Sequence, residues 1–293
     1  MRARRTQPAV TLAVGYTAAN MLADLHTHTT ASDGRLSPTA VVARAVEAGV
    51  ELLAITDHDV FDAWPQACAA RPVGLTLVPG IEFSTTWKGH GVHLVGLNFT
   101  PGHAAINAAL AHQSQARGVR AERIAERLHK QGLPDALAGA AALADNGAIG
   151  RPHFAAWLVS IGAANTIDQA FKKYLGANHS SALHDGWAAL PTIVEWIRDS
   201  GGTAVLAHPA KYRLTRTQLQ ELTATFHAAG GHALEVVSGL QRPDVTRDLA
   251  ALAARYQLRA GTGSDFHQPG QSWAALGRLA ALPADCTPVW EGW

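Results

Sequence analysis

Two histidines near the N-terminus have the spacing of a metal site. His26 and His28 follow a short apolar stretch and are separated by one residue. If that stretch is a β-strand, side chains two residues apart project to the same face, so both imidazoles reach one space. Imidazole is the commonest protein metal ligand, and the next loop adds a carboxylate at Asp33. Taken alone, the pair fits a metal site and a pair of core histidines equally well.

Side chains of the same kinds recur where five further strands are expected to end. These side chains are His58, Glu82, His93, His208 and the pair Asp265 and His267. Core histidines have no reason to occur at each strand end in turn, so the pattern predicts a metal centre. Nine nitrogen and oxygen ligands exceed what one four-coordinate ion needs and suit two or three ions that share a carboxylate. Mixed imidazole and carboxylate ligands fit Mn²⁺, Zn²⁺ or Fe²⁺.

Strand and helix patterns alternate between these residues. We expect strands just before His26 and over 52–56, 75–78, 92–97, 203–207, 233–237 and 258–261. Helices are expected over 38–48, 63–70, 191–199, 217–229 and 245–256. This alternation predicts a parallel α/β architecture. Because the polar groups occur at successive strand ends, a closed or nearly closed barrel is favoured over an open doubly wound sheet.

Residues 101–190 differ from the rest of the chain, being rich in alanine and without a strand pattern. We therefore predict a helical insertion here, with residues 21–100 and 191–293 forming the barrel domain. Arg117 lies on the same helical stripe as two apolar residues, Leu110 and Ile124, which is unusual for a solvated arginine. Three further arginines are expected on an exposed helix face: Arg120, Arg123 and Arg127.

Other residues of the insertion are candidates for substrate binding. Arg151 and His153 flank a proline at an expected helix start, which is a good position for binding an anion. Lys172 is either a substrate contact or part of a solvated face. Trp187 could stack on a nucleobase or belong to the core.

The composition excludes several classes of protein. The chain has 293 residues with a formal net charge of +1, so no global basic surface predicts nucleic-acid or membrane binding. A small phosphorylated substrate needs only a local basic pocket. The two cysteines, Cys68 and Cys286, indicate neither a disulfide framework nor a thiolate zinc site. No apolar run is long enough to span a membrane. Residues 1–20 are expected to form a disordered extension, and the protein is expected in the cytoplasm.

Six short motifs, in this order along the chain, resemble those of the PHP (polymerase and histidinol phosphatase) superfamily. They are His26-Thr27-His28, Thr56-Asp57-His58, Gly80-Ile81-Glu82, His93-Leu94-Val95-Gly96, His208-Pro209 and Ser264-Asp265-Phe266-His267. The resemblance covers residues 22 to about 275 and implies a distorted (β/α)7 barrel. The insertion and its segment Gly150–Phe154 resemble the 3′,5′-nucleoside bisphosphate phosphatase branch, also called RNase AM.

The resemblance also implies three groups of metal ligands. One ion would be held by His26, His28, Glu82 and Asp265. Glu82 would bridge to a second ion held by His93 and His208. The third ion would be held by Asp33, His58 and His267. Asp57 would either orient a ligand or cap the next helix, and we count it with Glu82 and Asp265 as candidates for a catalytic role.

The activity implied by the resemblance is removal of the 3′-phosphate from nucleoside 3′,5′-bisphosphates such as pAp. It also implies trimming of short 5′-phosphorylated RNA from its 5′ end. Two or three divalent ions, with Mn²⁺ expected first, would lower the pKa of bound water to about 7. Substrate contacts are expected from Arg117, Arg151, His153 and Lys172. No general acid and no obligate protein partner are evident.

Two other functions remain open on the sequence. One is a phosphatase for a small metabolite such as histidinol phosphate. The other is a metal-stabilised accessory module of the kind attached to polymerases. The long insertion argues against the first, and the complete ligand set argues against the second.

Overall fold

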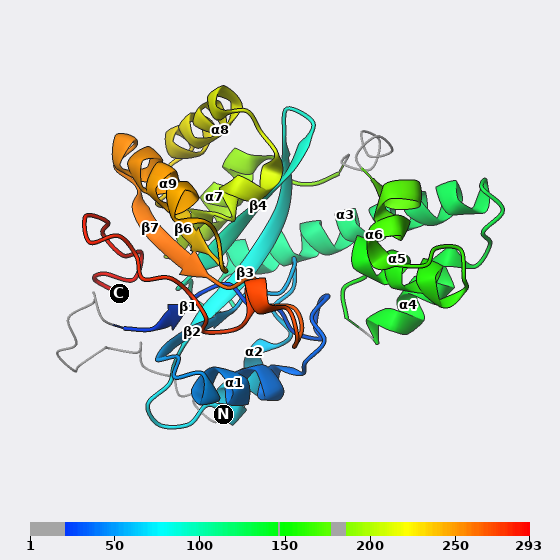
Figure 1. Cartoon of the computed structure of the whole chain (residues 1–293), viewed down its shortest axis with the longest axis horizontal. Helices are drawn as coiled ribbons and strands as arrows, with labels where there is room; N and C mark the ends of the chain where they lie inside the picture. The colour runs from blue at the N-terminus through cyan, green and yellow to red at the C-terminus, as the bar shows by residue number, and fades with distance from the viewer. Residues whose placement is uncertain (1–20, 146, 177–185) are drawn as a thin grey trace, which may run out of the picture.

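A nearly closed barrel forms the body of the protein (Figure 1). The computed structural model describes residues 21–145, 147–176 and 186–293, so the expected extension 1–20 lies outside the described residues. Seven strands follow one another in chain order around the sheet. They are β1 (Ala23–Asp24), β2 (Leu52–Ile55), β3 (Thr76–Trp87), β4 (His90–Leu97), β5 (Thr203–Leu206), β6 (Ala233–Ser238) and β7 (Arg259–Gly263).

Hydrogen bonds between the first and last strands bring the two edges of the sheet together. The Leu25 N–H donates to the Thr262 carbonyl over 3.1 Å, and beyond the strands the His28 N–H donates to the Phe266 carbonyl over 2.9 Å. The Asp265 N–H donates to the His26 carbonyl over 2.8 Å. The segments that follow β1 and β7, both rich in candidate ligands, are therefore held side by side. The expected barrel is confirmed.

One strand departs from the expected parallel arrangement. β4 runs antiparallel to both of its neighbours, β3 and β5. β3 and β4 are joined by a tight turn at Lys88 and Gly89, which is far too short for the helical crossover that a parallel pair requires. β3 also continues well beyond Val78, where we expected it to end, because Pro79 and Gly80 do not break it. Glu82 consequently lies within a long strand and not at a strand end.

Five helices pack around the barrel at the expected places: α1 (Pro38–Glu47), α2 (Trp64–Ala70), α7 (Leu190–Asp199), α8 (Arg216–Ala228) and α9 (Pro243–Arg255). The start of α1 shows how the local sequence fixes where a helix begins. The Ser37 hydroxyl accepts a hydrogen bond from the Ala40 N–H at 3.3 Å, and Pro38 occupies the first helical position. Within the described part of the chain, no helix is long and apolar enough to cross a membrane.

The remaining helices form a lobe beside the barrel, drawn in green in Figure 1. It contains α3 (Ala104–His129), α4 (Ala136–Ala144), α5 (Arg151–Ser160) and α6 (Ile167–Ala170), the last continuing into a π-helical turn at Phe171–Leu175. The lobe has its own apolar cluster, which includes Ile124 and Phe154. The first turns of α3 pack instead into the barrel core through Ile106 and Ala109. One long helix therefore carries side chains from the barrel to the lobe, and the exact domain boundaries stay a prediction.

Candidate metal centre and substrate cavity

Glu82 lies fully buried at the centre of the imidazole cluster. Its two carboxylate oxygens face two different sets of histidines. Oε2 lies 3.2 Å from His26 Nε2, 3.2 Å from His28 Nε2 and 3.1 Å from His58 Nδ1. Oε1 lies 2.8 Å from His93 Nδ1 and 2.9 Å from His208 Nε2. A carboxylate whose oxygens face separate ligand sets has the geometry needed to bridge two ions.

Two further carboxylates complete the cluster. Asp265 Oδ1 lies 3.3 Å from His28 Nε2, and Asp33 Oδ1 lies 3.3 Å from His267 Nε2. The nine sequence-predicted ligands are thus brought together. Three sets have ligand atoms all within 4.8 Å of one another: His26, His28, Glu82 and Asp265; His28, Asp33, His58 and His267; and His58, Glu82 and His93. The first set has the expected membership. The second contains His28 in addition to the expected ligands, and the third contains His58 in place of the expected His208.

Several buried polar atoms of the cluster have no hydrogen-bond partner. They are His26 Nε2, both ring nitrogens of His28, His58 Nδ1, His208 Nδ1 and Glu82 Oε2. Buried polar atoms are normally paired, because leaving them without a partner costs free energy. Divalent cations would satisfy these atoms, since neutral imidazole nitrogens and carboxylate oxygens are their usual ligands. The residues present therefore fit a divalent metal centre.

The charges of three carboxylates and one imidazole of the cluster also suit a cation. Burial alone would raise the pKa of the Glu82 carboxyl, but the surrounding imidazoles hold that pKa well below its usual value. The pKa values of Asp33 and Asp265 are likewise held well below their usual range, against the effect of burial, by neighbouring histidines. Burial lowers the pKa of His58 to about 3, so this ring is neutral at pH 7. Ionised carboxylates and a neutral imidazole are the protonation states that bind a metal ion.

Asp57 does not reach the cluster. Its carboxylate accepts hydrogen bonds from the Thr29 N–H (2.7 Å), the Thr29 hydroxyl (2.6 Å) and the Ser32 hydroxyl (2.6 Å). The α2 N-terminus has no side-chain cap, so Asp57 is not a helix cap either. The structure therefore does not support a catalytic role for Asp57. Instead it holds the loop that presents Asp33, because its bonds are all to residues of that loop.

Glu235 on β6 was missed by the sequence analysis. Its side chain is buried and lies 3.2 Å from His26 Nδ1, and it also accepts a hydrogen bond from the His208 N–H. A single acidic residue within the apolar run of β6 was the available signal, because a buried carboxylate needs a partner. Lys211 was also missed. It lines the cavity beside the cluster and contacts Asp265 over 2.5 Å.

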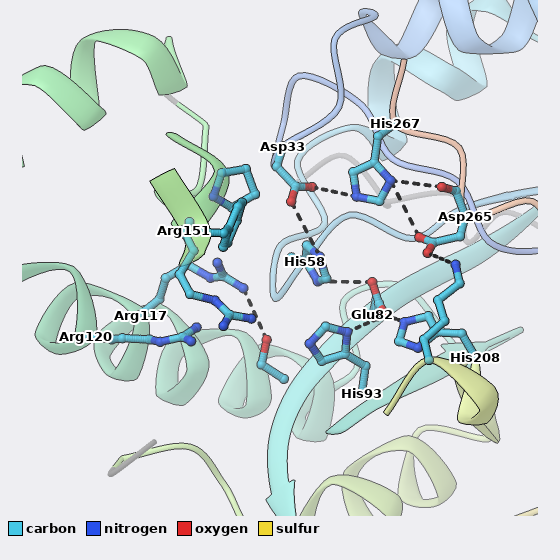
Figure 2. A pocket seen from close by; sticks show the side chains of 15 residues that line it. Asp33, His58, Glu82, His93, Arg117, Arg120, Arg151, His208, Asp265 and His267 are labelled. Carbon is cyan, nitrogen blue, oxygen red and sulfur yellow. Dashed lines mark hydrogen bonds and ion pairs between the residues drawn. The ribbon is translucent and has the colours of Figure 1, made fainter. Parts of the chain in front are cut away.

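A cavity of about 250 Å³ separates the cluster from the helical lobe. Figure 2 shows its two walls: Asp33, His58, Glu82 and Asp265 lie on one side, and Arg117, Arg120 and Arg151 point in from the other. Among the described residues, Arg117 pairs with the buried carboxylate of Asp59, whereas Arg120 and Arg151 have no carboxylate partner. Burial, with Arg151 and Arg117 nearby, lowers the pKa of Arg120 to about 9, so this guanidinium is still charged at pH 7.

The exposed position expected for Arg120 is wrong. Arg120 follows Arg117 by three residues on α3, and residues so spaced share one face of a helix. Both guanidinium groups flank the Trp187 ring, at 5.4 Å and 5.5 Å from its centre. Because that face looks toward the cavity, Arg120 lines it together with Arg117.

Two predicted substrate contacts do not line the cavity. The His153 ring caps its own helix, because Nδ1 accepts a hydrogen bond from the Gly150 N–H over 3.0 Å. Lys172 is exposed on the π-helical turn. Phe171, its neighbour, lines the cavity instead, with the Arg151 guanidinium 6.0 Å from the ring centre.

A nearly closed α/β barrel with histidine, aspartate and glutamate side chains gathered at its rim defines a metal-dependent phosphoesterase of the PHP class. Residues 24–115 match the PHP domain family. The chain is 45% identical to the 5′-3′ exoribonuclease Rnm of Escherichia coli K12 over 92% of this chain and 93% of that protein. It is 39% identical to the 3′,5′-nucleoside bisphosphate phosphatase of Chromobacterium violaceum over 92% and 95%. The chain belongs to the PHP family, in the branch that contains these two relatives.

Solved structures agree with this assignment. A protein of Chromobacterium violaceum described as an amidohydrolase, with bound sulfate and no metal, has a TM-score of 0.84 and 39% identity, covering 92% of this chain and 94% of its own. A protein of Bifidobacterium adolescentis described as a metal-dependent phosphoesterase has a TM-score of 0.72 and 29% identity, covering 91% and 92%. The barrel and its lobe are therefore shared with these proteins along nearly their whole lengths.

Proposed function

We propose that the protein is a metal-dependent phosphatase that removes the 3′-phosphate from nucleoside 3′,5′-bisphosphates such as pAp. One observation carries this proposal: the cavity has a metal-binding wall and, facing it, a wall of arginines. A substrate with one phosphate needs only the first wall. A substrate with two phosphates, separated by a nucleoside, would use both. The names of the two relatives support nucleotide and RNA substrates.

The two walls would divide the work. Divalent ions, Mn²⁺ first and Zn²⁺ or Fe²⁺ as alternatives, would activate water and offset charge on the phosphoryl oxygens. Glu82, Asp265 and the histidines would hold about two to three of them in place. Arg120 and Arg151, which lack carboxylate partners among the described residues, would hold the 5′-phosphate by charge-assisted hydrogen bonds. The nucleoside would then lie between the arginines and the metal centre, with its 3′-phosphate at the metal centre.

The same arrangement would serve 5′-phosphorylated RNA. In both substrates water attacks the phosphorus, and the bond to the 3′-oxygen of the first nucleoside breaks. With pAp the products are AMP and phosphate. With RNA they are a nucleoside 5′-phosphate and a chain shortened by one nucleotide that carries a new 5′-phosphate. Each product RNA is therefore again a substrate, as successive 5′-to-3′ trimming requires.

The alternative substrate histidinol phosphate fits the cavity poorly. It carries an ammonium group and no second phosphate, so the part of the molecule that would face Arg120 and Arg151 is positively charged, and like charges repel. An accessory module without catalysis would have no need for a cavity that joins the metal centre to Arg120 and Arg151.

Hydrolysis assays with added Mn²⁺ test the proposal. We expect much higher catalytic efficiency on pAp than on adenosine 3′-phosphate, which lacks the 5′-phosphate, or on histidinol phosphate. The 5′-phosphorylated dinucleotide pApA should release AMP, whereas ApA without the 5′-phosphate should be a poor substrate. Equal efficiencies on pAp and adenosine 3′-phosphate would contradict the two-wall argument. Efficient hydrolysis of histidinol phosphate alone would favour the metabolite phosphatase.

A further inference from the structure

Asp59 is a buried charged residue that the metal centre does not use. It lies one residue after His58, and its backbone N–H donates to the Glu82 carbonyl over 2.9 Å. Its φ of +57° is in the left-handed region, so the main chain turns sharply at this residue. The backbone of Asp59 is therefore fixed to the strand that carries the central carboxylate of the cluster.

The side chain of Asp59 points the other way, toward α3. One carboxylate oxygen accepts hydrogen bonds from the Ser84 N–H at 2.7 Å and the Gln113 amide at 2.8 Å. The other oxygen accepts from the Arg117 guanidinium, and this carboxylate is completely buried. Gln113 strengthens the connection, because its amide also donates to the Ser84 carbonyl over 2.7 Å. Asp59 thus links the metal-binding strand β3 to the helix that enters the lobe.

Arg117, which Asp59 holds in place, lies next to Arg120 and close to the start of the helix that carries Arg151. Arg120 lies on the same helix face, and the two guanidinium groups flank Trp187. Arg117 also donates to the Ile149 carbonyl over 3.4 Å, two residues before Arg151. In addition, Asp59 neutralises Arg117, so of the three arginines that line the cavity, Arg120 and Arg151 are left without a carboxylate partner among the described residues.

We propose that Asp59 is a positioning residue that fixes the distance between Arg120, Arg151 and the metal cluster, and so selects substrates whose two phosphates have that separation. This inference rests on the proposed bisphosphate phosphatase function. Asp59 lies behind the cavity wall and acts on the substrate only through Arg117. Its loss should therefore affect the recognition of the remote phosphate and spare the hydrolysis of a phosphate at the metal centre.

The Asp59→Asn variant tests the inference, because asparagine keeps the size of the side chain but removes the charge that holds Arg117. We expect the catalytic efficiency on pAp to fall at least tenfold, through a higher KM. Efficiency on adenosine 3′-phosphate, which offers the arginines no phosphate, should stay within twofold of wild type. Bound Mn²⁺ should also be unchanged. Asp62, an exposed carboxylate three residues further along, provides the matched control: Asp62→Asn should alter neither substrate.

A double variant distinguishes the loss of positioning from a loss of stability. This control is needed because an unpaired buried Arg117 is strongly destabilising. In Asp59→Asn/Arg117→Gln both charges are removed together, so the melting temperature should recover while the preference for pAp stays reduced. Equal losses on both substrates in a folded variant, or an unchanged preference for pAp, would overturn the inference. The wild-type enzyme reports separately on the proposed function: if it shows no preference for pAp, the bisphosphate proposal itself fails.

Discussion

Glu235 and His26, which come from opposite ends of the chain, are hydrogen-bonded inside the barrel. The distance from His26 Nδ1 to Glu235 Oε1 is 3.2 Å, and both side chains are buried. A carboxylate can only accept, so Nδ1 carries a proton in this bond, and Nε2 is the ring nitrogen that faces Glu82. Nε2 has no hydrogen-bond partner of its own and is the nitrogen placed to bind a metal ion. A carboxylate that fixes the tautomer of a ligating histidine is a recurrent feature of metal sites.

Glu235→Gln should therefore weaken metal binding without removing a ligand. Glutamine can still accept from Nδ1 through its carbonyl, but its amide nitrogen cannot accept from the His208 N–H, and it lacks the negative charge that makes the imidazole a stronger ligand. We expect metal affinity and turnover to fall ~10- to 100-fold, and excess Mn²⁺ to restore part of the turnover. Titration of the apo-protein with Mn²⁺ measures the affinity directly. An unchanged Mn²⁺ affinity would show that the bond serves packing only.

Glu82→Gln should be the most damaging change to the cluster. Glu82 is the residue whose two oxygens face separate sets of histidines, so its charge would be shared by two ions. Removal of the charge on a ligand shared by two ions should reduce turnover more than the change at Glu235, which contacts ligands but is not one itself. We therefore expect turnover to fall by more than ~100-fold. The barrel should remain folded because its core is apolar, as circular dichroism can check. Turnover close to wild type would rule out the bridging role.

Metal content is a third prediction. Elemental analysis of protein purified with added Mn²⁺ should give about two to three ions per chain, because the cluster offers three ligand sets. Metal removal by a chelator should abolish activity and lower the melting temperature by several degrees, since a ligand at 100 times its Kd stabilises the folded state by ~2.7 kcal/mol. If fully active protein contained one ion or none, the assignment of these residues to two or three metal sites would be wrong.

Arg151→Ala should impair pAp selectively. Among the described residues Arg151 has no carboxylate partner, and its guanidinium lines the cavity. Loss of a charge-assisted contact to the 5′-phosphate should cost ~1.5–3 kcal/mol, or roughly ten- to a hundredfold in catalytic efficiency. Hydrolysis of adenosine 3′-phosphate should barely change. A parallel loss on both substrates, together with a lower melting temperature, would indicate a structural role instead.

Lys172→Ala provides the control for that experiment. Lys172 belongs to the same lobe and carries the same charge as Arg151, but it is exposed and does not line the cavity. Its removal should therefore leave both substrates unaffected.

Local chemistry made part of the site predictable from the sequence. His26 and His28 share a direction because of their spacing, and Ser37-Pro38 begins a helix because the hydroxyl can cap it; neither property depends on the rest of the fold. The alternation of strands and helices predicted an α/β architecture, and the polar groups at successive expected strand ends favoured a barrel. Pro79-Gly80 predicted a strand end that the structure does not have, since a strand paired on both sides can continue through residues that usually interrupt one.

Only the tertiary structure determines which residues that are far apart in the sequence contact one another. Asp59 and Arg117 are 58 residues apart, Lys211 and Asp265 are 54 apart, and His26 and Glu235 are 209 apart. No periodicity connects such residues, because which side chains meet depends on how β4 reverses direction and where α3 leaves the barrel. The sequence by itself determined which residues could bind metal ions, since ligand chemistry belongs to the side chain. Only the folded chain determined which charges are already paired, and hence that Arg120 and Arg151 face the cavity without a carboxylate partner among the described residues.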